Sequence, residues 1–133
     1  MTHIIFIAYF VSLLFANGIK LTILVKNIQV GKGFVVVEIW NDEKTFFKKP
    51  FLTKSSKADS QTLEFSFELP VAEYAISVYQ DINDNKQLDL GVFHIPKEPI
   101  GFGNNFRPKF SAPKYKDCAI NLTKPMIEEI ELK

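Results

Sequence analysis

The residues best suited to chemistry lie in one run, residues 81–89, where oxygen-bearing side chains occupy every second position. Calcium prefers about six to eight hard oxygen ligands, and a tightly looped backbone can turn alternate side chains toward one centre. Side-chain oxygens would come from Asp81, Asn83, Asn85 and Asp89, and a backbone carbonyl from Gln87. The spacing therefore predicts a candidate site for Ca²⁺ or a similar hard cation.

The same run also fits a turn that needs no metal. Asn and Asp side chains hydrogen-bond the nearby backbone in Asx turns, and Lys86 would supply an internal cation for a carboxylate. The run is not an EF-hand loop, because Lys86 stands where that loop has Gly and Val92 where a bidentate Glu would close it. The sequence leaves both interpretations open.

Catalytic signatures are sparse. Cys118 is the only cysteine, which excludes an internal disulfide and a Cys-based zinc site, and no nucleophile elbow, Walker loop or dinucleotide fingerprint occurs. A dyad of Cys118 with His94 is the sharpest catalytic idea, but Cys118 alternates with Ile120 and Leu122, which predicts an inert core thiol. We therefore expect a non-enzymatic domain. The alternative is a small secreted hydrolase that uses loop carboxylates, namely Asp81, Asp84, Asp89 and Glu98.

A candidate binding surface follows the acidic run. Its predicted members are His94, Glu98, Phe102, Asn104, Asn105 and Arg107. Gly101 and Gly103 indicate unusual backbone conformations, with Phe102 packed inward between them as an anchor. Either this segment folds onto the sandwich edge through Phe93, Phe102, Phe106 and Phe110, or it exposes an aromatic platform for a glycan or peptide.

The secondary-structure elements that position these residues are predicted to be strands. Apolar alternation or β-branched and aromatic enrichment predicts strands over residues 19–26, 34–40, 62–69, 74–79, 115–122 and 126–132. With turn residues between them and almost no helical pattern, these runs predict an all-β antiparallel sandwich of about seven strands with Greek-key connections, immunoglobulin-like or prealbumin-like. Residues 81–114 form the longest irregular stretch, which in a compact domain is usually functional.

A lysine-rich segment lies between two of these strands. Lys48, Lys49 and residues 54–57 are expected to form a solvated hairpin loop. The adjacent pairs Phe46-Phe47 and Phe51-Leu52 would either cover the sandwich edge or touch a membrane surface.

The N-terminal residues predict export. Residues 4–15 are apolar apart from Ser12, a run too short for a bilayer-spanning helix but typical of a signal peptide, which we expect to end at Gly18. The alternative is a buried N-terminal strand. A signal peptide over 1–18 and a β-sandwich domain over 19–133 would place the protein in the periplasm or at the cell surface, without a transmembrane anchor after cleavage. The net charge of +1 over 133 residues gives no electrostatic reason to expect nucleic acid as a partner.

From Tyr74 onward the sequence resembles a family of bacterial exported domains of unknown function, number 2141. The matching residues are Tyr74-Ala75-Ile76, Asp81, Asn83, Asn85, Leu88, Asp89, residues 95–98, residues 101–105, Ala112-Pro113 and Asp117. Lys86 replaces the Gly and Gly103 the Ser that are usual in the family. The resemblance implies an exported β-sandwich and brings no established activity or substrate. The predicted function is thus binding or scaffolding of a glycan or protein at the cell envelope, through an 81–110 loop stabilised by calcium.

Overall fold

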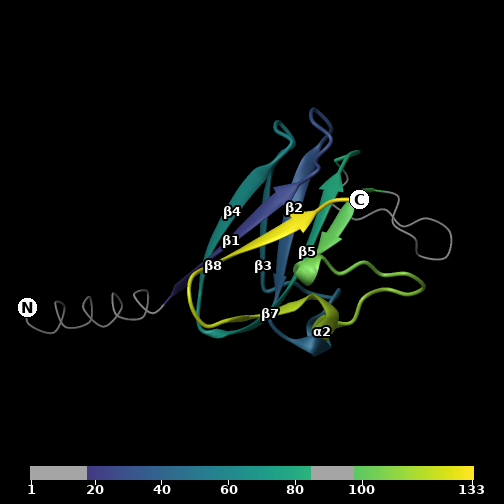
Figure 1. The fold of residues 1–133 in the computed structure, drawn as a ribbon. Helices are drawn as coiled ribbons and strands as arrows, with labels where there is room; N and C mark the ends of the chain where they lie inside the picture. The colour runs from purple at the N-terminus through teal and green to yellow at the C-terminus, as the bar shows by residue number, and fades with distance from the viewer. Residues whose placement is uncertain (1–17, 85–97) are drawn as a thin grey trace, which may run out of the picture.

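The protein is a sandwich of two β-sheets (Figure 1). The computed structural model describes residues 18–84 and 98–133. One sheet has the order β4 (Leu63–Leu69), β1 (Ile19–Lys26), β8 (Met126–Glu131). The other has the order β3 (Leu52–Lys57), β2 (Phe34–Trp40), β5 (Ala72–Asp81), β6 (Ile100–Phe102), with β7 (Ala119–Leu122) also paired to β5. The predicted all-β sandwich is confirmed.

Alternating apolar residues build the core between the sheets. In β1, Leu21, Ile23 and Val25 are fully buried, and in β2 the buried side chains of the same core come from Val35, Val37 and Ile39. Burying such side chains is the main favourable term in folding, at about 1.5–3 kcal/mol each. The period-two pattern in the sequence therefore corresponds to the inner faces of real strands.

The strand pairing differs from the prediction in one respect. All pairs are antiparallel except β1 with β8, which run parallel, with Leu21 opposite Met126. The connection from β7 back to the other sheet brings β8 in along the same direction as β1, so this sheet is mixed. An exposed ion pair between Lys26 and Glu129, at 3.2 Å, crosses the two parallel strands and contributes less than about 1 kcal/mol.

Three local predictions were wrong. Residues 54–57 of the lysine-rich segment, expected as a hairpin loop, belong to β3, an edge strand whose exposed position allows polar side chains on both faces, whereas Lys48 and Lys49 lie in the exposed turn before it, as expected. Tyr115–Cys118 is a helical turn, α2, instead of the start of a strand, because the Asp117 carboxylate accepts a hydrogen bond from the Lys114 N–H at 2.8 Å. The stretch expected to be irregular contains β6, which pairs with β5.

A second apolar cluster lies on the outer face of the larger sheet. It consists of Trp40, Ala75, Phe102, Tyr115 and Cys118. Three short helical turns adjoin these residues in the sequence. η1 (Glu43–Thr45) follows β2, which ends at Trp40, η3 (Gly103–Asn105) follows Phe102, and α2 contains Tyr115 and Cys118. The Trp40 indole N–H donates to the Ser77 hydroxyl at 2.9 Å, so the buried polar groups on this face are paired.

Both clusters and every described strand lie within residues 19–133. The predicted signal peptide lies outside the described residues, except for its last residue, Gly18. In the part of the chain that the structure describes, no helix is long and apolar enough to span a membrane.

Candidate functional site

The predicted working loop starts and ends on adjacent strands. β5 and β6 pair antiparallel, with Tyr79 opposite Ile100. Beyond this pair the Gln80 N–H donates to the Pro99 carbonyl at 2.9 Å, and the Ile82 N–H donates to Glu98 Oε2 at 2.7 Å. The two flanks of the loop are therefore joined at a hydrogen-bonded base.

Gln80 ties this base to the neighbouring loop. Its side chain is fully buried, accepts a hydrogen bond from the Gln29 N–H at 3.0 Å, and donates to the carbonyls of Gln29 and Lys32, both at 2.7 Å. Gly33, with φ of 65°, lies so close that a Cβ there would collide with the Asp81 carbonyl. The end of β5 is thus fixed from two sides.

Acidic groups gather beside the base. Asp81 is 1% exposed and Glu98 is 7% exposed. Burial, followed by the charges of Glu38, Asp81 and Glu98, raises the pKa of the Tyr79 hydroxyl to about 12. Burial also raises the pKa of Glu38 above its ordinary value. All three carboxylates therefore lie close enough to the Tyr79 hydroxyl to act on its pKa.

The predicted cation ligands are only partly described. Asp81 is buried at the end of β5 and Asn83 is exposed in the following turn, whereas Asn85, Gln87 and Asp89 lie outside the described residues, as does His94. Within residues 18–84 and 98–133, no three His, Cys, Asp or Glu side chains converge as a metal site would require. Glu98 adds a carboxylate that was not among the predicted cation ligands. The oxygens of Asp81, Asn83 and Glu98 fit a hard cation chemically.

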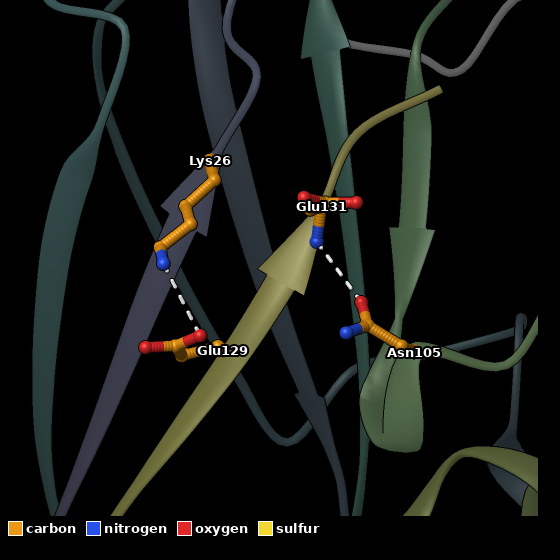
Figure 2. Close-up of polar contacts among 4 residues, drawn as sticks. All are labelled: Lys26, Asn105, Glu129 and Glu131. Atoms are coloured by element: carbon orange, nitrogen blue, oxygen red, sulfur yellow. Dashed lines mark hydrogen bonds and ion pairs between the residues drawn. The ribbon is translucent and has the colours of Figure 1, made fainter.

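The remaining predicted binding residues fasten the segment after β6 to the sandwich. The Asn104 amide donates to the carbonyls of Asp117, at 3.2 Å, and Ala119, at 2.9 Å. Asn105 Oδ1 accepts from the Glu131 N–H at 3.0 Å, as Figure 2 shows. The Arg107 guanidinium donates to the Glu131 carbonyl at 2.6 Å and to the Ile100 carbonyl at 3.4 Å. These side chains position the segment against β7 and β8.

Phe102 is 2% exposed and belongs to the outer apolar cluster, so its ring is not part of an exposed platform. Its inward packing is as expected, but the reason for the flanking glycines is different. Neither Gly101 nor Gly103 has positive φ. A Cβ on Gly101 would collide with Ile130, and one on Gly103 with the Cys118 carbonyl, so close packing requires glycine there. Phe110, expected to help fold the loop down, is fully exposed.

Cys118 is fully buried, as predicted, but in a different environment. It lies in the outer cluster with Trp40 and Phe102, whereas Ile120 and Leu122 face the inner core. Burial, followed by the charge of Asp117, raises the pKa of the Cys118 thiol to about 12. A protonated, buried thiol is a poor nucleophile.

The sequence analysis named the pair Phe46-Phe47, and the structure shows that Phe47 is the exposed ring of the two while Phe46 is half-buried. Phe47 stacks on Phe46 with ring centroids 4.0 Å apart and makes edge contacts with Trp40 at 5.8 Å and Phe102 at 6.3 Å. It has φ of 62°, a conformation that a bulky side chain rarely adopts. The adjacent pair of phenylalanines in the sequence was the available signal.

A family model described as "Uncharacterized protein conserved in bacteria (DUF2141)" matches residues 23–129. Comparison with curated proteins and with solved structures gave no match.

Proposed function

The chain belongs to the DUF2141 family of uncharacterized bacterial proteins, and we propose that it is an exported, non-enzymatic β-sandwich that binds or scaffolds a glycan or protein of the cell envelope. Its working surface is the 81–110 segment. Calcium stabilises the first part of that segment. The leader over residues 1–18 directs the domain to the periplasm or the cell surface.

The hydrogen-bonded base of the hairpin between β5 and β6 carries this proposal. Two bonds, Gln80 to Pro99 and Ile82 to Glu98, hold both flanks of the loop on one rigid sheet. Binding residues are disproportionately found on loops held by such scaffolds, because a fixed base lowers the entropy lost on binding. Two polar residues at the base, Asn83 and Asp84, are exposed on this surface.

Calcium would reinforce this base through the acidic run. Asp81 and Asn83 supply oxygens from the start of the run and Glu98 from its far side, while the proposed remaining ligands are Asn85, Gln87 and Asp89. A bound divalent ion would attract the carboxylates of Asp81 and Glu98 to one centre. It would then couple the two flanks of the loop more tightly.

Cosedimentation of residues 19–133 with washed bacterial envelopes tests the binding function. We expect retention that falls at least about threefold in the double variant Asn83→Ala/Asp84→Ala, because both side chains are exposed on the proposed surface. The matched control, Asp59→Ala/Asn121→Ala, removes exposed residues elsewhere and should bind like the wild type. Purified peptidoglycan as a second probe separates a glycan partner from a protein partner. Equal retention of all variants would contradict a role for the loop.

A further inference from the structure

Large apolar side chains are exposed at the end of the sandwich where β2 ends and β3 begins. Phe47 is 46% and Phe51 44% exposed, and Leu52 and Val71 are also exposed. We call these four residues the Phe47 patch. Isolated exposed apolar residues are common, but a group of them that is contiguous on the surface marks an interaction site.

Contacts connect the members of the Phe47 patch. The Phe47 ring packs on Trp40, and the next residue toward the N-terminus, Ile39, accepts a hydrogen bond from the Phe51 N–H at 2.8 Å. The Phe51 ring stacks on Tyr74 with centroids 6.3 Å apart, and the Tyr74 hydroxyl donates to the carbonyl of Pro70, which precedes Val71. Phe51 and Val71 are therefore linked through Tyr74 and Pro70, while Phe47 packs on the outer cluster at the same end of the sandwich.

Exposed lysines border the apolar rings. Lys44, Lys48 and Lys49 are all exposed in the same segment. Its two acids are Asp42 and Glu43, and the Asp42 carboxylate is engaged as the cap of η1, where it accepts from the Lys44 N–H at 2.9 Å. The segment thus combines apolar rings with a net positive charge.

The Phe47 patch lies at the end of the sandwich where β1 begins and β4 ends. Ile19, the first residue of β1, lies opposite Leu69, at the turn that carries Val71. The acidic turn after β5 lies at the opposite end, because β5 begins at Ala72 and ends at Asp81 (Figure 1).

We propose that the Phe47 patch docks this end of the sandwich onto the surface of an anionic phospholipid bilayer. Phe and Leu side chains enter the boundary between headgroups and acyl chains, and Lys side chains pair with the phosphates. Residues 81–84 of the proposed 81–110 surface lie at the other end of β5, whereas Phe102 of the same segment contacts Phe47.

Vesicle flotation of residues 19–133 tests the docking. We expect binding to vesicles of phosphatidylglycerol and phosphatidylcholine, weaker binding to pure phosphatidylcholine, and loss of binding in high salt. Phe47→Asn removes the ring while Asn accepts the left-handed conformation. Combined with Lys48→Glu and Lys49→Glu, it should lower anionic-vesicle binding at least about fivefold. The matched control, Val30→Asn/Lys32→Glu, changes exposed residues at the opposite end and should bind like the wild type.

Three outcomes would overturn the proposal. One is a wild-type protein that does not float with anionic vesicles. Another is an equal loss in the patch variant and its control while circular dichroism shows both folded. The third is a dimer in solution that Phe47→Asn dissociates, which would assign the surface to a second copy of this chain. Failure of vesicle binding leaves the envelope test of the loop unaffected, so the two proposals can be judged separately.

Discussion

The Glu98 carboxylate accepts a hydrogen bond from the backbone N–H of Ile82 at 2.7 Å, across 16 positions of sequence. Because Glu98 is only 7% exposed, this bond is shielded from water and stronger than a surface contact. It joins the start and the end of the loop that the sequence marks as the working segment. The loop is thus presented from a fixed base on β5 and β6.

We expect Gly103→Ser to destabilise the domain, although Ser is usual at this position in the resembling family. A Cβ at Gly103 would collide with the Cys118 carbonyl, and relieving the clash requires movement of η3 or α2. The cost should be about 1–3 kcal/mol in the free energy of unfolding, measured by urea denaturation. Gly31→Asn, at a position with no atom within 4 Å, serves as the control and should cost less, because Asn tolerates the φ of 86° there better than other side chains do. Equal effects would show that the packing argument is wrong.

Asn104→Asp should loosen the contact between η3 and the start of β7. The amide now donates to two carbonyls, those of Asp117 and Ala119, and a carboxylate would face both without a donor. We expect a loss of about 1–3 kcal/mol by urea denaturation. Asn104→Gly should lose less, since glycine adopts the observed φ of 62° without strain. A smaller loss for Asp than for Gly would contradict the assigned hydrogen bonds.

Cys118 should be unreactive in the folded protein. Burial raises its pKa to about 12, so Ellman's reagent at pH 8 should modify the thiol only after urea is added. A raised folded-state pKa gives stability that is present below the ordinary thiol pKa of about 8.5 and is lost as the pH rises toward 12. Cys118→Ala should therefore show a shallower decline in stability at alkaline pH. Modification of the native thiol within minutes would refute the assignment of this residue to the core.

We expect the ionised Glu38 carboxylate to lower the free energy of unfolding at neutral pH. Burial raises its pKa in the folded state, so the favourable contribution exists at acidic pH and disappears as the pH rises through the folded-state pKa. Glu38→Gln, which keeps the shape without the charge, should raise the urea midpoint at pH 7 and give no gain at pH 4. Glu64→Gln, on the exposed face of β4, is the matched control. A gain of equal size at both pH values would indicate a cause other than ionisation.

Strands buried on one face could be predicted from sequence, because such burial requires apolar residues at every second position. The bounds of β1 and β2 matched the predicted ones. β3 could not be recognised, because an edge strand exposed on both faces needs no apolar alternation. The strand predicted over residues 115–118 was wrong. Cys118 and Ile120 follow the alternating pattern of a strand, but the capping hydrogen bond to the Asp117 carboxylate favours a turn of helix.

The candidate sites depended on contacts through space, which the sequence does not record. Glu98 was predicted as a binding-surface residue, but the residues next to it in the sequence did not indicate its hydrogen bond to the Ile82 N–H. Phe102 was expected to anchor the loop and does so, whereas the exposed ring beside it is Phe47, turned outward by a left-handed backbone conformation. Backbone strain of this kind costs about 1–3 kcal/mol and is set by the surrounding structure.

Calcium binding at the base of the loop is the central claim, and a thermal melt of residues 19–133 with and without calcium tests it most directly. At about 5 mM calcium we expect the melting temperature to rise by several degrees, as for an extracellular site of submillimolar affinity. Asp81→Asn and Glu98→Gln should abolish the rise, and Glu64→Gln should keep it. An unchanged melting temperature at this calcium concentration would contradict the claim and leave the acidic run as a metal-free turn.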